Sequence, residues 1–460
     1  MSTNVKVIFE SNSLIVENET VKNFVENSPS AHCSVLLEGT HYIVIKEKSS
    51  YTTEKIRSIA GDIARDLGSR KVVTAFISAA DLIDRFNKFE KEDVLTAFVE
   101  GWELGAYQFV TYKPSVKPFK TALKIEEGDN IKSAITAGKI RAEAMAFSRD
   151  LMNEVSNVLN PQTFPEVLKK QFEGTDVEVN VLDKAKLEEL KMNGVLTVGR
   201  GSQYEPAFVE LVYKGDETKP LVALVGKGVT FDTGGISLKS GKDLSDMRMD
   251  MGGAAAVAGA MTLLAKSQAK ANVVVLIPMV ENAPDNTSVY PGEVISYKNG
   301  KTVQVGNTDA EGRLILADAL IRAGEWNAEY IVNIATLTGA VVNALGTELG
   351  GVFGDEELAA EMKKIGEQNG DFVWPMPLVE AYDRSLDSDY ADMNNISSLS
   401  SAGSITAGLF LRRFVPESSK WLHVDMAGVM EKNKASGYYA KSATGYGARL
   451  LADFTTFVSK

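Results

Sequence analysis

The sequence predicts an α/β protein in which two α/β domains are joined by a long helix. The C-terminal domain is expected to contain a mixed, largely parallel sheet flanked by helices. Two observations support this fold class. Segments with strand composition alternate with segments of helical periodicity along the chain. Beyond residue 160, apolar runs of strand length are separated by helical segments, a spacing typical of parallel βαβ units.

The N-terminal α/β domain is expected over residues 1–128. Strand composition marks residues 5–9, 41–46 and 71–77, and helical patterning marks residues 54–67 and 92–107. A stretch with two prolines at residues 113–118 indicates a break after this alternation. This domain shows no pattern of catalytic residues, so we look for the function in the rest of the chain.

A linker helix is expected within residues 129–158, running from Lys132 to about Asn153. Apolar residues recur on one of its faces at helical spacing, with basic residues off that face. The apolar residues are Ala137, Ile140, Ala144, Phe147 and Leu151. This pattern predicts a helix that buries one side.

The third region, residues 159–460, contains four apolar runs with strand composition. They are residues 221–225, 273–278, 330–334 and 421–424, and an alanine-rich helix is predicted at 252–266. Polar or small residues follow directly after three of these runs, beginning with Lys227, Thr336 and Asp425. Ligands of open α/β sheets bind outside the carboxyl ends of the strands, so we expect the functional site there.

Composition narrows the class of protein. The formal net charge of −12 argues against general nucleic-acid binding, which requires basic surface. The single cysteine, Cys33, excludes an intrachain disulfide and suits a reducing compartment. The N-terminus lacks a signal-peptide pattern and the longest apolar runs are too short to span a bilayer, so we expect a cytoplasmic protein without a membrane partner. Three histidines argue against a histidine-based zinc site or a Ser-His-Asp triad.

Two acidic motifs carry the chemistry. Residues 307–313 read Asn-Thr-Asp-Ala-Glu-Gly-Arg, and in extended backbone Asp309, Glu311 and Arg313 would share a face. Residues 225–239 read Val-Gly-Lys-Gly-Val-Thr-Phe-Asp-Thr-Gly-Gly-Ile-Ser-Leu-Lys, and Asp250 follows. Four converging carboxylates would be costly to bury without a cation. A structural salt-bridge loop is the alternative for residues 307–313.

The two motifs together closely resemble those of the leucyl aminopeptidases, two-metal exopeptidases, and the resemblance runs from about residue 130 to the C-terminus. It implies that residues 159–460 form a catalytic metallopeptidase domain acting on peptides. The implied ligands of two divalent metal ions, Zn²⁺ or Mn²⁺, are Lys227, Asp232, Asp250, Asp309 and Glu311. Asp232 and Glu311 would bridge the ions, Lys227 and Asp250 would complete one site, and Asp309 the other.

The resemblance also implies roles for the remaining site residues. Lys239 would stabilise the oxyanion of the tetrahedral intermediate, and Arg313 would hold bicarbonate as general base. The pocket for a leucine-like side chain would comprise Met247, Thr336, Leu337, Gly339, Ala427 and Met430, with the Leu337 and Gly339 backbone aligning the peptide. A homohexamer is implied as well. One departure, Val155 where the family often has proline, concerns the linker rather than the chemistry.

Two alternatives from other classes are weaker. Residues 235–243 superficially suggest a phosphate-binding loop, but the spacing is one residue too long and Asp243 replaces the required Ser or Thr. A non-catalytic interaction protein would show loss of a ligand, and every matched ligand is present.

Overall fold

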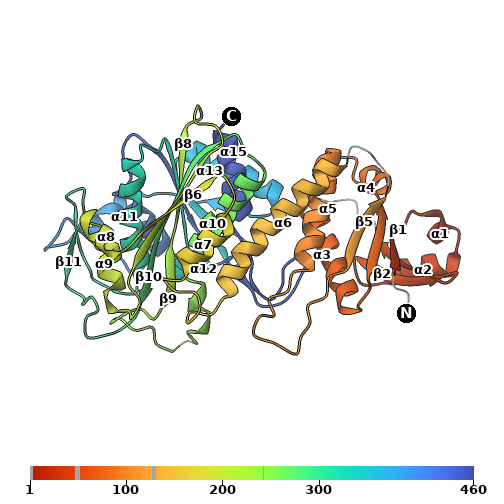
Figure 1. Cartoon of the computed structure of the whole chain (residues 1–460), viewed down its shortest axis with the longest axis horizontal. Helices are drawn as coiled ribbons and strands as arrows, with labels where there is room; N and C mark the ends of the chain where they lie inside the picture. The colour runs from red at the N-terminus through yellow and green to blue at the C-terminus, as the bar shows by residue number, and fades with distance from the viewer. Residues whose placement is uncertain (1–3, 47–51, 127–130, 242) are drawn as a thin grey trace. The chain divides into compact units, whose positions relative to one another are not determined.

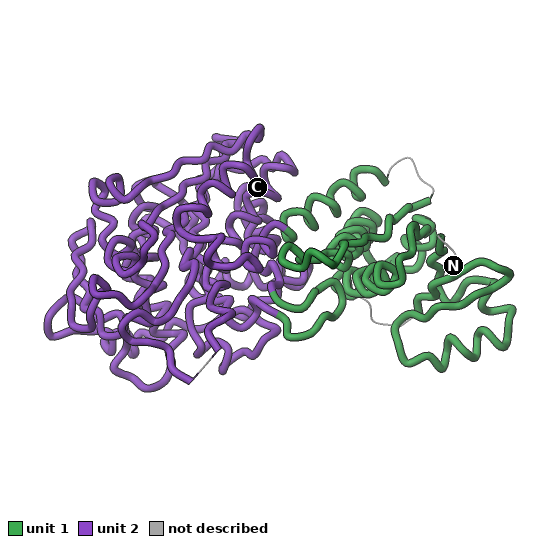
Figure 2. Tube along the Cα trace, turned by 60° about the horizontal axis from the view of Figure 1, so that its bottom comes forward, with its two compact units in different colours: residues 1–146, 432–442 green, residues 147–431, 443–460 purple. Residues whose placement is uncertain are grey.

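The computed structural model describes residues 4–46, 52–126, 131–241 and 243–460 (Figure 1). The chain forms two compact units (Figure 2): residues 1–146 with 432–442, and residues 147–431 with 443–460. The boundary expected at residue 128 lies outside the described residues. The expected linker helix is present as α6 (Lys132–Asn153), and the division between the units falls inside it.

The first unit contains a five-stranded sheet in the order β2-β3-β1-β4-β5. Only β2 and β3 pair antiparallel. Its strands are β1 (Asn4–Phe9), β2 (His32–Leu37), β3 (Thr40–Ile45), β4 (Thr74–Ser78) and β5 (Ala122–Glu126). Its helices besides α6 are α1 (Ser13–Val16), α2 (Glu19–Asn27), α3 (Thr53–Ser69), α4 (Ala79–Arg85) and α5 (Lys91–Gly105). The strand predicted from residue 71 begins only at Thr74, because Lys71 adopts a left-handed φ of 59° in the turn after α3.

Helices α3 and α5 approach each other closely because glycine stands at their crossing. A Cβ atom on Gly101 would lie 2.1 Å from the carbonyl oxygen of Arg57, and one on Gly105 would lie 2.2 Å from that of Gly61. Any larger residue at either position would force the helices apart. The apolar faces of these helices share one core with the inner strands of the sheet.

The second unit is built on a nine-stranded sheet whose main order is β15-β14-β17-β13-β8-β10-β7-β6, with β9 paired to β10. The central strands β17, β13, β8 and β10 run parallel, and β14, β7 and β6 add antiparallel pairings. The mixed, largely parallel sheet predicted from the sequence is thus confirmed. The strands are β6 (Val177–Leu182), β7 (Ala207–Lys214), β8 (Leu221–Gly226), β9 (Gly228–Asp232), β10 (Asn272–Asn282), β13 (Tyr330–Ala335), β14 (Gly350–Gly354), β15 (Val373–Pro375) and β17 (Lys420–Asp425).

Helices flank both faces of this sheet (Figure 1). The alanine-rich α10 is buried all round over residues 252–264, which explains why that stretch carries no charge. The helices are α7 (Phe164–Phe172), α8 (Lys184–Glu189), α9 (Asn193–Val198), α10 (Gly252–Lys266), α11 (Gly312–Glu325), α12 (Gly339–Leu345), α13 (Glu356–Asn369), α14 (Gly403–Arg412) and α15 (Ala448–Val458). Short strands complete the chain: β11 (Val294–Ser296), β12 (Thr302–Gln304), β16 (Met393–Asn394), β18 (Glu431–Lys432) and β19 (Ser442–Ala443). Among the described helices, none has both the length and the apolar character that crossing a bilayer requires.

Candidate metal centre

The predicted site residues gather at the carboxyl ends of the parallel strands. Lys227 follows β8, Asp232 ends β9, Thr336 follows β13 and Asp425 ends β17. Because neighbouring parallel strands end at the same edge of a sheet, these four residues from distant parts of the sequence are brought to one place. The expectation that the site follows the strand ends holds for all of them.

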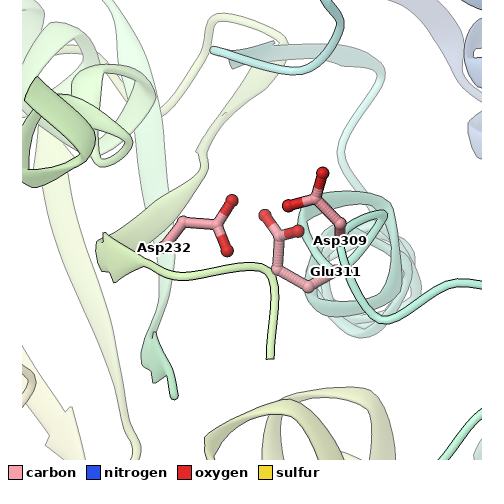
Figure 3. Close-up of side chains that lie close together, drawn as sticks. All are labelled: Asp232, Asp309 and Glu311. Carbon is pink, nitrogen blue, oxygen red and sulfur yellow. The ribbon is translucent and has the colours of Figure 1, made fainter. Parts of the chain in front are cut away.

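Three carboxylates converge at the centre of this edge. Oxygen atoms of Asp232, Asp309 and Glu311 lie within 4.8 Å of one another, and their side chains point toward a common space (Figure 3). The residues Asp232 and Glu311 are each only 2% exposed. Buried carboxylates this close together repel one another, so the arrangement needs positive charge.

Two lysines supply part of that charge. Lys227 Nζ lies 2.8 Å from Asp250 Oδ2 and 2.9 Å from Glu311 Oε1, and it donates a hydrogen bond to the Thr336 carbonyl. Burial alone would lower the pKa of Lys227, but Asp250, Glu311 and Asp232 raise it above its ordinary value. A fourth carboxylate, Asp250, is thereby joined to the cluster.

Lys239 pairs with the other half of the cluster. Its Nζ lies 2.7 Å from Asp232 Oδ2 and 2.5 Å from Asp309 Oδ1. Burial lowers the pKa of this lysine, and the two carboxylates more than reverse that effect, so it stays protonated. The lysines therefore divide the carboxylates into two pairs: Asp250 with Glu311, and Asp232 with Asp309.

The cluster remains short of positive charge. Four carboxylates face two ammonium groups, and Glu311 Oε2 is buried with no hydrogen-bond partner in the part of the chain that the structure describes. Burial, followed by the Asp232 carboxylate, raises the pKa of Glu311 to about 8 although Lys227 opposes the shift. An excess of carboxylate oxygens in a confined space is the ligand set that divalent cations favour. The residues present therefore fit a metal site.

A glycine turn returns Lys239 to the carboxylates. Gly234 and Gly235 have φ values of 89° and 62°, which favour glycine, and Lys239 N donates to the Thr233 carbonyl at 2.9 Å. Thr308 Oγ1 donates to the Gly234 carbonyl and accepts from Ser237 N. The two sequence motifs are thus tied together through backbone groups.

Residues 307–313 do not form the extended segment that the alternating pattern predicts. Asp309 N donates to Asn307 Oδ1 in a tight turn, and Glu311 is the N-cap residue of α11. The shared face expected for these side chains is therefore wrong, because the segment turns and begins a helix. Asp309 and Glu311 converge by this turn instead.

Arg313 lies in the first turn of α11 and is buried. Its guanidinium donates to the Asn395 carbonyl at 2.8 Å and sits 6.0 Å from the centre of the Phe410 ring. Burial lowers the pKa of Arg313 to about 10. Its Nε is buried without a hydrogen-bond partner, and within the described residues no ion pair joins it to Asp309 or Glu311. The salt-bridge loop is therefore not the arrangement observed.

The residues predicted for the pocket lie in segments next to the carboxylate cluster. Thr336 is buried and donates to Asp250 Oδ1 at 2.7 Å, which connects the pocket to the carboxylate cluster. Leu337 and Ala427 are brought together because both donate backbone N–H groups to Asp425 Oδ1. The remaining three predicted residues are Met247, Gly339 and Met430, and all three are at least partly exposed. Met247 lies in a short 3-10 helix before Asp250, Gly339 begins α12, and Met430 follows Ala427.

The sequence-based prediction leaves out Asn282 and Asn395, and it gives Asp425 a place at the strand ends but no role. Asn282, at the end of β10, donates to Asp232 Oδ1 and to the Thr308 carbonyl. The Asn395 side chain accepts from Gly306 N and Asn307 N and donates to the Asn307 and Ala310 carbonyls. Asp425 accepts hydrogen bonds from the two loops that carry predicted pocket residues. Only Asp425 and Asn282 had a usable signal, a polar residue at the end of an apolar strand. Asn395 lies in a loop whose composition gives none.

The phosphate-loop alternative does not fit the geometry. Its Lys242 lies outside the described residues, and Lys239 is paired with two carboxylates. Ser237 N is bonded to Thr308 Oγ1 rather than open to an anion. A ring of acidic groups would repel phosphate here.

Comparison with known proteins identifies the family. Residues 146–452 match the catalytic domain of the cytosol aminopeptidase family and residues 46–115 match its N-terminal domain. Proteins named probable cytosol aminopeptidase from Rickettsia felis and Rickettsia canadensis are 38% and 39% identical over 435 and 434 residues, covering 92% of this chain and 86% of each relative.

Two solved structures share the fold of the whole chain. The bottromycin maturation enzyme BotP in complex with Mn superposes with a TM-score of 0.91 at 29% identity, and a second structure of BotP gives 0.90 at 30%; both cover 100% of each chain. The resemblance to aminopeptidases inferred from the two motifs is thus confirmed. This chain belongs to the cytosol aminopeptidase family and is a metal-dependent exopeptidase, a hydrolase of peptides.

Proposed function

We propose that this aminopeptidase uses a two-metal centre to release N-terminal residues from peptides, with a preference for leucine-like side chains. The observation that carries the proposal is the charge imbalance of the cluster, in which four carboxylates face two lysines and Glu311 Oε2 has no partner in the described structure. Such a site is completed by added cations rather than by the protein alone.

The lysine pairs support a division of the ligands. Lys227 and Asp250 would belong to one metal site and Asp309 to the other, with Asp232 and Glu311 shared between them. Two divalent cations held there would act as Lewis acids on the scissile carbonyl and activate a water molecule. Oxygen ligands with one amine suit either Zn²⁺ or Mn²⁺, and the Mn complex of BotP makes Mn²⁺ the first ion to test.

The exposure of the two lysines supports different roles for them. The Lys227 side chain is 4% exposed, whereas that of Lys239 is 20% exposed. A ligand needs no access to substrate, but a group that stabilises the oxyanion must reach the substrate carbonyl. We therefore assign Lys239 to the oxyanion, where such a donor typically lowers the barrier by about 3 kcal/mol.

Arg313 would hold bicarbonate, which would serve as general base for the attacking water. The buried, unpartnered Nε and the position in the first turn of α11 both support an anion at this point. In degassed buffer, activity should fall and then recover in a saturable way as bicarbonate is added. Arg313→Ala should remove this response while metal content stays normal; loss of metal without any bicarbonate effect in the parent enzyme would contradict the role.

The pocket for the first side chain would be formed by Met247, Thr336, Ala427 and Met430, while the Leu337 and Gly339 backbone aligns the peptide. Methionine side chains give an adaptable apolar surface suited to leucine. The free α-amine of the substrate would bind at the acidic cluster, which explains removal of one residue at a time. Aspartyl substrates should be poor, because the assigned pocket contains no cation.

One experiment tests the proposal directly. Protein stripped of metal is reconstituted with Mn²⁺ or Zn²⁺ and assayed on a leucyl chromogenic amide and on its N-acetylated form. We expect activity to require metal and to appear only on the substrate with a free amine. Comparable rates on both substrates would rule out the aminopeptidase geometry.

Assembly and location are further parts of the proposal. We expect a homohexamer located in the cytoplasm, in keeping with the name of the relatives. Sedimentation analysis of the metal-loaded protein checks the first expectation, and cell fractionation checks the second. A monomer at micromolar concentration would contradict the hexamer.

A further inference from the structure

Asp425 is a completely buried carboxylate that neither the metal centre nor the pocket assignment uses. It ends β17, directly beside Ala335 at the end of β13. Its Oδ1 accepts hydrogen bonds from Leu337 N at 3.1 Å, Ala427 N at 3.2 Å and Thr338 N at 3.4 Å. Its Oδ2 accepts from Thr338 Oγ1 at 2.6 Å. One side chain thus collects four donors.

All four donors are neutral and belong to the two loops that carry the proposed pocket. In the described part of the chain, no ion pair is formed by Asp425. Burial raises the pKa of Asp425 to about 6, while the hydrogen bonds led by that of Thr338 oppose the rise. Burying a charged carboxylate there costs free energy. The hydrogen bonds that it accepts fix the position of the loop after β13 relative to the loop after β17.

The hydrogen bond to Thr338 extends this control to α12. Thr338 Oγ1 donates its proton to Asp425 and accepts from Val341 N at 3.1 Å as the N-cap of the helix. The carboxylate therefore fixes the orientation of the capping hydroxyl. Gly339, the first residue of α12, follows directly. Asp425 thus holds the backbone directly before Gly339 and the N–H group of Ala427.

We propose that Asp425 is a positioning residue that holds the two pocket loops in register and thereby sets substrate affinity and side-chain selectivity. This inference rests on the proposed pocket. A purely structural carboxylate would stabilise the fold without changing the preference among substrates. A positioning carboxylate must change that preference when its acceptor oxygens are altered.

Asp318 provides a matched control. It is a buried carboxylate that accepts from Val195 N at 2.9 Å at the start of α9, in a part of the unit that carries none of the proposed pocket residues. Asp318→Asn and Asp425→Asn make the same chemical change in equally buried settings. A general loss of stability should therefore appear in both variants. A change in substrate affinity or preference should appear only in Asp425→Asn.

The test measures kcat and KM of Mn²⁺-loaded wild type, Asp425→Asn and Asp318→Asn on leucyl, alanyl and phenylalanyl chromogenic amides. Asp425→Asn keeps one acceptor oxygen but removes the charge that strengthens the three backbone N–H bonds, and it places an N–H₂ where Oδ2 accepts from Thr338 Oγ1, so the hydroxyl must turn away. KM for the leucyl amide should therefore rise about tenfold and the leucine-to-alanine preference should fall. Its kcat should change less than about threefold, since the metal ligands are untouched. Asp318→Asn should keep the wild-type KM and preference.

Thr338 gives a second route that does not depend on Asp425→Asn folding. Thr338→Val removes the hydroxyl and Thr338→Ser retains it, so KM should be higher in Thr338→Val than in Thr338→Ser. Unchanged KM and preference in Asp425→Asn, or equal KM values in the two Thr338 variants, would overturn the inference. If wild type itself fails to cleave the leucyl amide, the proposed function fails instead, so the two failures are distinguishable.

Discussion

Buried charge is used differently in the two units of this protein. In the first unit, Glu100 is fully buried and is met by Arg57 Nε at 2.8 Å and Arg141 Nε at 3.5 Å, while Arg57 also reaches Glu54. In these three ion pairs of the described structure, two carboxylates face two guanidinium groups. In the second unit, four carboxylates face two lysines. Within the described structure, Oε2 of Glu311 has no hydrogen-bond partner.

The difference shows how a structural cluster can be told from a binding cluster. Arginine offers a planar set of donors that satisfies carboxylates within the protein, whereas lysine is a compact point charge. The arginine cluster connects α3, α5 and α6, and each of the ion pairs named above joins a guanidinium to a carboxylate. The unbalanced cluster at the strand ends has acceptor oxygens in excess of its donors, as a cation site requires.

The largest effect is expected from removing a shared carboxylate of the unbalanced cluster. Asp232→Ala takes away one of the two carboxylate partners of Lys239 and a proposed ligand of both metals. Aminopeptidase activity should become undetectable and metal content, measured by mass spectrometry of the purified protein, should fall. Glu166→Ala, which removes an exposed acid on α7, serves as the control and should retain both. Full activity with both metals bound in Asp232→Ala would contradict the assignment of Asp232 as a shared metal ligand.

Disrupting the arginine cluster of the first unit should lower the stability of the fold and leave catalysis unchanged. Glu100→Gln removes the buried carboxylate that Arg57 and Arg141 share, so the free energy of unfolding should fall by about 3–5 kcal/mol. Metal content and kcat per folded molecule should remain those of wild type. The measurement is urea denaturation beside metal analysis. Loss of metal in this variant would show that the two clusters are not independent.

Lys239→Ala distinguishes a catalytic lysine from a merely charge-balancing one. If the ammonium meets charge that develops in the transition state, kcat should fall by roughly 10²–10³ with metal content retained. A variant with normal kcat and only a raised KM would mean that the lysine binds substrate and does not assist the chemistry.

The smallest effect concerns a buried group that carries no charge. His423 accepts from Asn333, whose own oxygen is held by Trp421, and burial lowers the pKa of His423 to about 3, with Arg313 adding to the shift. The unfolded chain binds a proton near pH 6.5 and the folded one does not, so this residue's contribution to stability is complete above pH 6.5 and is lost as pH falls toward 3.

The slope from this single group approaches about 1.4 kcal/mol per pH unit. Denaturation of wild type and His423→Gln at pH 7, 6 and 5 isolates it, because all other groups titrate in both proteins. Stability of the variant should decline less on acidification. Equal slopes would mean that His423 is protonated in the folded protein.

The sequence by itself determined the class of fold and the chemistry of the site. Apolar runs placed β8, β10, β13 and β17, and the alanine-rich, almost uncharged stretch at 252–266 predicted a helix with its observed bounds. The residues implied as ligands could be named because the two acidic motifs resemble those of a known family. Local composition is enough for such features, since strand and helix patterns repeat over a few residues.

Only the tertiary structure decided how the site is held together. Apart from the bond between Asp425 and Ala427, the side chains of Asn282, Asn395 and Asp425 bond to groups 26 to 89 residues away, and no local period marks such pairs. The turn at residues 307–311, the antiparallel additions β6 and β7, and the assignment of residues 432–442 to the first unit also escaped the sequence pattern. The physical reason is that a polar side chain buried in a fold takes its role from whichever donors the chain brings beside it, and that is a property of packing rather than of sequence neighbours.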